Sequence, residues 1–554
     1  MFHSKHNPAQ QPGDQSRTGL RMNMRFSALV IAVFVSACAS QTPEQLVNDA
    51  AEALGGQDRI LAIETLTIDG EGTAGSLGQN LGAAGAIHAN SILGFKQEID
   101  VAQQRMSQQY SSERQFTFVL PPFSGPVHSV IDGDIAYNVG ADGTARPGGN
   151  AAAQQIEMLR HPITIIRAAL EEGATISPIR EDGNADVVDV TTVKGHEVTL
   201  TIDRDTQLPQ SVSNMIFNGL LGDVAVVTSF LDYEDVDGVM LPTRLRTVVD
   251  EAYEYLQREI IVATNTLDAD LSHLAAPESV TAAETSGGGG FPGGFPGGGQ
   301  QPPIVVTELA PGIHHFGGRE ASGGFQYNMV LVEFEDHTEL IEPSSHALTL
   351  QAIEKAREIL PDKPVTKMIV THSHSDHAAG ARTAVAEGLG LVVHESAAEY
   401  FDDIIRRPFA SNPDYLAMNP VVEPQPTVGV GDHLRVEDAT QTMDIYHFPG
   451  NAHADHMLYV HFPEHGIAVD ADMYNMDPGP GRPAPDIWPT SMKTGVIPNF
   501  NLVWIDAFYN EIDQRELNVD WHVPIHGVVV RRERLEAERA LWTEDGLMRL
   551  EDVE

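Results

Sequence analysis

The stretch Thr371-His372-Ser373-His374-Ser375-Asp376-His377 places three histidines and one aspartate within six positions, directly after an apolar run at 368–370. Imidazole nitrogens and carboxylate oxygens are common ligands of Zn²⁺ in proteins. His372 and His374 are two residues apart, so in an extended segment both side chains point to the same side and can bind one ion. Asp376 and His377 lie where the chain turns into an expected helix over 378–387, and this turn directs them toward a second ion. A histidine-rich surface loop is the alternative interpretation, which the expected buried strand at 368–370 disfavours.

Two ions need more ligands than one loop supplies, and three later segments offer them. His453 follows a Pro-Gly turn at 449–450. The apolar run 466–469 leads to Asp470 and Asp472, and the run 523–525 ends at His526. The ends of strands are common places for ligands in α/β folds. The sequence therefore predicts a metal site built from four separated segments.

The order of these motifs, His-x-His-x-Asp-His followed by His, Asp and His-Gly, resembles the metallo-β-lactamase fold superfamily over residues 304–554. The resemblance implies an α/β domain, a four-layer αβ/βα sandwich with the metal site between the edges of two sheets. The implied ligands are His372, His374 and His453 for one ion, Asp376, His377 and His526 for the other, and Asp472 as the bridge between them. Two alternatives stay open, with Asp470 in place of Asp472 and His456 as a substitute ligand.

Two positions depart from the usual pattern of the family. Ala454 follows His453, where the family usually has serine or threonine. Glu342 ends a strand that usually ends in aspartate. From that position we expect Glu342 to orient a metal ligand through a hydrogen bond rather than to bind the metal itself. Neither departure removes an implied ligand.

The resemblance implies a metallo-hydrolase with two divalent ions, zinc in the first place and iron or manganese as alternatives. Its expected nucleophile is a metal-bridging hydroxide, because a bound divalent ion lowers the pKa of water toward about 7. Asp376 is the expected catalytic residue, which orients the nucleophile or relays its proton.

The expected substrate is a small molecule with an ester-like bond, such as a thioester or a lactone. Asp472 is present and the implied ligand set contains no cysteine, so the pattern is similar to the glyoxalase II, lactonase and sulfatase-like branches. β-Lactamase, sulfatase and phosphodiesterase activities remain as alternatives.

The charge of the chain disfavours nucleic acid as a partner. Lys and Arg number 34 against 78 Asp and Glu, which gives a net charge of −44. A groove that binds nucleic acid carries clustered basic residues to hold phosphates. No basic run of that kind stands in the sequence, so no nucleic-acid partner is expected.

Residues 1–37 are predicted to be a signal peptide. Arg21 and Arg25 precede an apolar run at 26–34. This run is too short for a stable membrane anchor but suits the core of a signal peptide. Met22 and Met24 are alternative translation starts, either of which gives a more compact signal.

Cys38 is the only cysteine of the sequence, and Val35-Ser36-Ala37-Cys38 resembles the bacterial lipobox. The resemblance implies that Cys38 is lipidated and that the protein is an outer-membrane lipoprotein that faces the periplasm, held to the membrane by its lipid anchor. An ordinary cleaved signal, which would give a free periplasmic protein, is the alternative.

Residues 38–285 are expected to form a mainly antiparallel β domain with helices. Thr42-Pro43-Glu44-Gln45 predicts a helix start, and Gly55-Gly56 predicts its end. Strands are predicted at 65–68, 198–202 and 224–227, and a helix interrupted at Pro162 is predicted over 158–170.

The segment 200–242 resembles LolA-like lipoprotein-carrier domains, which implies a concave apolar surface for a hydrophobic ligand. An alternative function follows, an envelope lipoprotein that binds such a ligand while its metal domain is only weakly catalytic. Residues 286–303 are rich in glycine and proline, a composition that predicts a flexible linker.

Overall fold

The computed structural model describes residues 41–85, 87–114, 125–281, 302–319, 326–451, 453–473, 496–498, 500–527, 529–533, 536 and 547–549. The predicted signal peptide, Cys38 and most of the predicted linker lie outside the described residues. By their contacts, residues 42–554 form one unit and residues 1–41 another. Within the described part of the chain, no helix has both the length and the apolar character needed to cross a membrane.

The N-terminal β region, residues 42–281, is built on one antiparallel sheet of 14 strands. Their order is β6-β5-β4-β3-β2-β1-β14-β13-β12-β11-β10-β9-β7, and β8 pairs with β9. The strands are β1 (Thr65–Asn80), β2 (Ile87–Asp100), β3 (Arg105–Arg114), β4 (Gly125–Asp132), β5 (Ile135–Val139), β6 (Ala145–Pro147), β7 (Thr175–Ile176), β8 (Arg180–Asp182), β9 (Ala185–Thr191), β10 (Glu197–Asp203), β11 (Pro209–Asn218), β12 (Gly222–Val236), β13 (Val239–Val249) and β14 (Tyr255–Leu267). The predicted antiparallel β character and the three predicted strands are confirmed.

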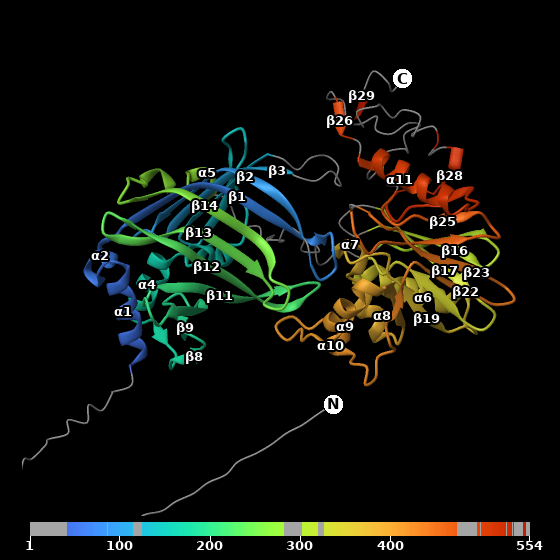
Figure 1. The fold of residues 1–554 in the computed structure, drawn as a ribbon, viewed down its shortest axis with the longest axis horizontal. Coiled ribbons are helices and arrows are strands. Elements are labelled where there is room, and N and C mark those ends of the chain that lie inside the picture. Colours follow the sequence, from blue (N-terminus) through green and yellow to red (C-terminus); the bar gives the residue numbers. More distant parts are fainter. Residues whose placement is uncertain are drawn as a thin grey trace, which may run out of the picture. The chain divides into compact units, whose positions relative to one another are not determined.

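Four helices of this region pack on one face of the curved sheet (Figure 1). They are α1 (Pro43–Leu54), α2 (Gln57–Ala62), α3 (Ala151–Met158) and α4 (Pro162–Leu170). The 3₁₀ turn η1 (Ser272–Leu274) and the short helix α5 (Glu278–Thr281) follow β14, and Val280 of α5 packs with Val130 and Tyr137 in a separate small cluster. The predicted start of α1 is confirmed, because the Thr42 side chain accepts a hydrogen bond from the Gln45 N–H and Gly55 caps the other end at φ 136°.

The predicted interruption near Pro162 is confirmed, but the helical residues before it extend back to Ala151 rather than starting at Met158. Two helices stand there, and Pro162 begins the second one, α4, with His161 as its N-cap residue. Proline is tolerated in the first turn of a helix, where its missing N–H would have no intrahelical partner.

The C-terminal α/β region, residues 304–549, contains two mixed sheets. The first has the order β15-β16-β17-β18-β19-β20-β21, and the second β22-β23-β24-β25-β27-β28. Their strands are β15 (Val305–Ala310), β16 (Ile313–Arg319), β17 (Gln326–Glu333), β18 (Thr338–Ile341), β19 (Val365–Ile369), β20 (Gly390–His394), β21 (Val428–Val430), β22 (His433–Glu437), β23 (Thr442–His447), β24 (Leu458–Phe462), β25 (Ile467–Val469), β27 (Trp521–Val523) and β28 (Val530–Arg531). A separate small pair is formed by β26 (Val496–Pro498) and β29 (Leu547–Arg549).

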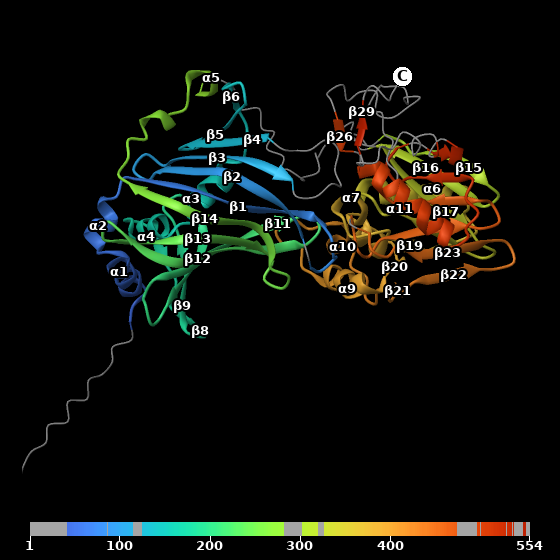
Figure 2. The same cartoon turned by 45° about the horizontal axis from the view of Figure 1, so that its top comes forward.

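Helices cover the outer faces of the two sheets (Figure 2). They are α6 (His346–Ile359), α7 (Ser375–Ala378), α8 (Ala381–Ala386), η2 (Glu395–Ala397), α9 (Ala398–Arg406), α10 (Tyr415–Met418) and α11 (Phe500–Gln514). Side chains of α6 and α9 share one buried core with the first sheet, and Phe508 and Ile512 of α11 pack on Tyr459 and Ala468 of the second sheet. The predicted α/β class is confirmed.

The helix predicted over 378–387 is observed as the shorter α8, which Gly380 separates from α7. The Gly380 N–H donates to the carbonyl of Ser344 at 3.1 Å. A Cβ atom at this position would lie 1.8 Å from the carbonyl oxygen of Pro343. The close backbone approach therefore requires glycine and interrupts the helix.

The two regions share buried contacts. Leu220, Leu221, Val224 and Tyr255 of the β region belong to the same apolar cluster as the first sheet of the α/β region. The hydroxyl of Tyr253 donates to the carboxylate of Asp403 at 3.0 Å.

Candidate metal centre

The candidate ligands lie where strands end and loops begin. The chain leaves β19 and runs through His372 and His374 into α7, which carries Asp376 and His377. The N–H groups of His377 and Ala378 donate to the His374 carbonyl at 2.9 and 2.8 Å, so the histidine loop folds directly into the helix. Asp472 follows β25, and His526 follows β27.

Seven side chains form three overlapping groups, in each of which one possible ligand atom per residue lies within 4.8 Å of the others. The groups are His372, His374 and His453, then His372, His377 and Asp472, then Asp376, His377 and His526. Asp472 Oδ2 is 3.1 Å from Nε2 of His453 and 3.1 Å from Nε2 of His377. This one carboxylate therefore touches both ends of the cluster.

The donor set fits divalent cations. Nε2 of His453 lies 3.2 Å from Nε2 of His372, and Nε2 of His526 lies 3.2 Å from Nε2 of His377. Buried imidazole nitrogens that face one another in pairs, with carboxylate oxygens beside them, match the nitrogen and oxygen ligands that Zn²⁺ takes. A cation between them would satisfy both rings of a pair at once.

The electrostatics of the cluster agree with this fit. Burial alone would raise the pKa of Asp472, but the His377 and His526 rings hold it well below its usual value. Burial opposes charge on the His377 ring, yet the Asp472 and Asp376 carboxylates raise its pKa well above the usual value. The carboxylates thus carry negative charge that positive neighbours offset, which is the role a divalent ion fills.

Residues 322–489 match the model of the metallo-beta-lactamase superfamily. This segment is a metallo-beta-lactamase superfamily domain. Together with the clustered ligands, the match identifies it as a metallo-hydrolase domain.

Solved structures similar to the chain include three metallo-beta-lactamases. The one from Pontibacter korlensis is 17% identical over 43% of this chain and 98% of its own, with a TM-score of 0.31. FIM-1 from Pseudomonas aeruginosa, in its mono-zinc form, is 18% identical over 44% and 95%, with a TM-score of 0.30. The one from Hirschia baltica is 19% identical over 43% and 97%, with a TM-score of 0.30. No curated protein matches the chain.

Glu342 contacts two candidate metal ligands, His377 directly and His372 through Thr371. Its Oε1 lies 3.1 Å from Nδ1 of His377, and its Oε2 accepts a hydrogen bond from the Thr371 hydroxyl at 2.8 Å. Because that hydroxyl uses its proton on Glu342, it accepts from Nδ1 of His372 at 3.0 Å. Both rings are therefore left to present Nε2 to the centre of the site.

Two non-glycine residues of the metallo-beta-lactamase domain adopt positive φ beside the ligands. Glu342 has φ 79° and directly follows β18, and Ala471 has φ 51° and directly precedes Asp472. Such a conformation costs about 1–2 kcal/mol for a residue with a side chain. Strain of this kind gathers at functional sites, where the surrounding structure holds it. Here the positive φ of Glu342 directs its carboxylate toward His377, and the positive φ of Ala471 directs the carboxylate of Asp472 toward the centre of the cluster.

The two open alternatives lie outside the three groups of possible ligands. Asp470 Oδ2 is 2.8 Å from Nδ1 of His522, and both side chains are buried. His456 instead holds the histidine loop, because its Nε2 accepts from the Ser373 N–H at 3.0 Å. His394 pairs with the Ser396 hydroxyl at 2.8 Å.

Sequence reasoning missed residues that position the ligands of the metallo-beta-lactamase domain. The buried Asn328 side chain donates to the carbonyls of Pro524 and Gly527 at 2.7 and 2.9 Å, and so it fixes the loop that carries His526. Gln79 and Asn80 of the β region also contact the cluster. An asparagine within a strand and a polar pair about 300 residues upstream give no recognisable sequence signal.

Proposed function

We propose that the protein is a dinuclear metal-dependent hydrolase that cleaves an ester-like bond in a small molecule. In this proposal His372, His374 and His453 hold one ion, Asp376, His377 and His526 hold the other, and Asp472 bridges them. The observation that carries it is the position of the Asp472 carboxylate, 3.1 Å from both His453 and His377. Zinc is the proposed metal, with iron and manganese as alternatives.

Bound divalent ions would polarise the scissile bond and lower the pKa of water at the site. Asp376 is the proposed catalytic residue because its side chain is 35% exposed while the histidines around it are buried. Burial opposes its ionisation, but His377 and His526 keep its pKa well below the usual value. An ionised, partly open carboxylate can orient an attacking water and accept its proton.

A small uncharged or weakly charged substrate agrees with the composition of the chain. The net charge of −44 repels polyanions. Thioesters and lactones are the proposed substrates because the proposed ligand set contains Asp472 and no cysteine. β-Lactams, sulfate esters and phosphodiesters are alternatives within the same reaction type.

Elemental analysis of the purified protein and a substrate panel test the proposal. About two metal ions per chain are expected, together with turnover of a thioester or lactone that stops after treatment with a chelator and returns with zinc. His372→Ala and His526→Ala should each reduce the bound metal and the turnover. A protein that binds two ions but hydrolyses none of the thioester, lactone, β-lactam, sulfate-ester and phosphoester probes contradicts the proposal.

A second candidate function, binding of a hydrophobic ligand, has support in the β region. A recess of about 340 Å³ is lined there by apolar side chains that include Val101, Met158 and Leu159, with Lys194 and His196 at polar positions. Fluorescence of an apolar dye should rise on binding to the wild-type protein and fall with Met158→Glu. Equal dye binding by both proteins speaks against this candidate.

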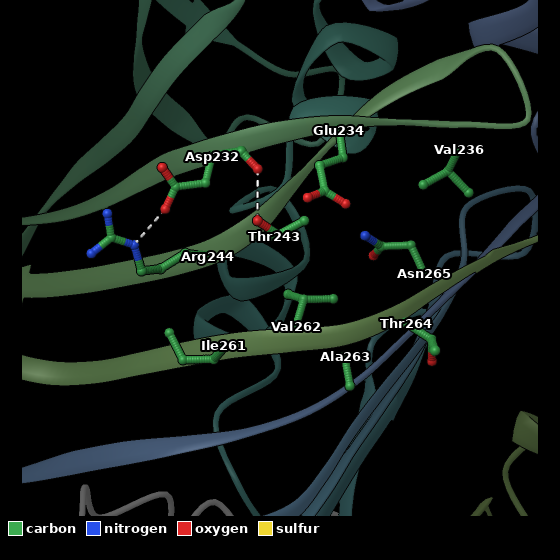
Figure 3. A pocket seen from close by; sticks show the side chains of 10 residues that line it. All are labelled: Asp232, Glu234, Val236, Thr243, Arg244, Ile261, Val262, Ala263, Thr264 and Asn265. Carbon is green, nitrogen blue, oxygen red and sulfur yellow. Dashed lines mark hydrogen bonds and ion pairs between the residues drawn. The ribbon is translucent and has the colours of Figure 1, made fainter.

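Another recess, of about 510 Å³, lies over β12, β13 and β14 (Figure 3). The Arg244 side chain in this recess already forms ion pairs, 2.9 Å from Asp232 and 3.7 Å from Glu259. The lining of this recess is mixed and polar, so we propose the recess beside Met158 for the apolar ligand.

We further propose that the protein is exported and anchored in the outer membrane through a lipidated Cys38, facing the periplasm. The support is the lipobox-like stretch that ends at the only cysteine of the sequence. Mass spectrometry of the mature N-terminus should find a lipid-modified Cys38 in the wild-type protein, and Cys38→Ser should release the protein from membranes. An unmodified cysteine at this position contradicts the proposal.

A further inference from the structure

The end of the β1–β2 hairpin of the β region touches the candidate metal centre. Strands β1 and β2 pair at Gly75 and Ala89 and, after a register shift, again at Asn80 and Ile87. Gln79 and Asn80 are thus the last residues of β1, and Leu81 follows them. We call residues 78–81 the hairpin tip. Four hydrogen bonds link this end of the hairpin to the two loops that hold His374 and His453.

The first contact is made to a proposed metal ligand. Nε2 of His374 lies 3.0 Å from the main-chain carbonyl oxygen of Asn80. A carbonyl only accepts hydrogen bonds, so His374 is the donor and carries its proton on Nε2. In a neutral ring the other nitrogen, Nδ1, is then the one that can bind a metal. Asn80 thus selects the ligand atom of His374.

The second contact is made to the proposed catalytic carboxylate. The Gln79 side-chain amide donates to Oδ1 of Asp376 at 3.0 Å. The other oxygen of this carboxylate, Oδ2, lies 3.2 Å from Nε2 of His526. Gln79 therefore holds one oxygen of Asp376 while the second faces the ligands.

Further contacts fix the tip in place. The N–H of Asp455, two residues beyond His453, donates to the carbonyl of Leu81 at 2.8 Å, and His88 lies 3.4 Å from the carbonyl of His453. Gly78 has φ 85°, and a Cβ atom there would lie 3.1 Å from the hydroxyl oxygen of Ser375. On the side of the β region, the Tyr255 hydroxyl donates to the carbonyl of Ala83 at 2.9 Å.

We propose that the hairpin tip is a positioning element of the metal centre, in which the Asn80 carbonyl makes His374 bind metal through Nδ1 and Gln79 orients Asp376. Partners that hold the outer nitrogen of a ligating histidine typically change metal affinity or activity by about 10–100-fold when removed. The inference rests on the proposed metal ligands. It makes the β region part of the hydrolase rather than an independent binding domain.

A shortened hairpin tests the role of Asn80. Replacing residues 77–87 with Asn-Gly keeps the pairing of Gly75 with Ala89 and supplies a two-residue hairpin turn. In the full chain loaded with Co²⁺, the visible absorption spectrum should change and the apparent metal affinity should fall by about 10-fold or more. An unchanged spectrum with unchanged affinity overturns the role of Asn80.

Point variants test the role of Gln79 without altering the backbone. Gln79→Ala should lower kcat by about 10-fold with little change in KM, and Gln79→Glu should lower it further by placing a second carboxylate beside Asp376. Gln103→Ala and Gln103→Glu are the matched controls, because Gln103 is exposed in another turn of the same sheet. Equal kcat values for the Gln79 variants and the wild-type protein overturn the role of Gln79.

The outcomes separate this inference from the proposed function. A wild-type protein that binds no metal would contradict both the proposed hydrolase function and the positioning role of the hairpin tip. A wild-type protein that binds two ions and turns over substrate, with hairpin variants that behave identically, would end the inference about the tip alone.

Discussion

Oε1 of Glu342 lies 3.1 Å from Nδ1 of His377, and both side chains are fully buried. Through Thr371 the same carboxylate also reaches His372. Replacing Glu342 with glutamine puts an amide donor where one of these groups needs an acceptor. We expect Glu342→Gln to weaken metal binding by about 10–100-fold, as measured by competition with a chromogenic chelator.

Asp444→Asn is the control for Glu342→Gln. Asp444 is also a buried carboxylate, paired with His433 and Arg435 at 2.7 and 2.8 Å, but it is outside the candidate ligand groups. This variant should lose stability without losing metal affinity. Equal losses of affinity in the two variants would mean that Glu342 acts only through general stability.

Asp472 and Asp470 give opposite expectations although they are two residues apart. Asp472 contacts His377 and His453, whereas Asp470 contacts His522. Asp472→Asn should therefore reduce the bound metal measured by elemental analysis. Asp470→Asn should keep the metal but lower the melting temperature, because it weakens a buried pair. Retention of both ions by Asp472→Asn would rule out its bridging role.

Removal of metal should lower the melting temperature of the protein. A ligand that binds only the folded state at 1,000 times its Kd stabilises that state by about 4 kcal/mol. Differential scanning fluorimetry before and after dialysis against a chelator measures the effect, and added zinc should reverse it. The variant His372→Ala should respond much less. If the melting temperature of the wild-type protein does not change after treatment with a chelator, metal does not stabilise the fold.

His161 predicts a pH dependence of stability that is unrelated to metal. Burial lowers its pKa to about 3 in the folded protein, whereas an exposed histidine has a pKa of about 6.5. Between these pH values the unfolded chain binds a proton at His161 that the folded protein does not. The free energy of unfolding is therefore unaffected by His161 above a pH of about 6.5 and decreases as the pH falls from there toward about 3.

We therefore expect His161→Asn, which keeps an N-cap side chain for α4, to lose less stability than the wild-type protein between pH 7 and pH 4. Urea denaturation at several pH values provides the measurement. His465→Asn, a change at a partly exposed histidine, should leave the wild-type slope intact. Parallel pH profiles for His161→Asn and the wild-type protein would refute the expectation.

Local signals in the sequence were enough to predict several features. Thr42, Pro43 and Gly55 act within one helix, so the bounds of α1 could be read from neighbouring residues. The apolar runs before His372 and His526 indicated strands, and the motif order indicated the family that matches residues 322–489. Pro162 marked the interruption between α3 and α4, but the start of α3 at Ala151 had no comparable signal.

The sequence by itself determined which segments carry candidate ligands and which fold class holds them, because strand patterns and ligand spacing are local properties. Only the tertiary structure separated Asp472 from Asp470, connected Glu342 to both His377 and the Thr371 hydroxyl, and brought Gln79 to Asp376 across 297 residues. Contacts of this kind depend on how sheets and loops pack in space. No spacing along the chain encodes them.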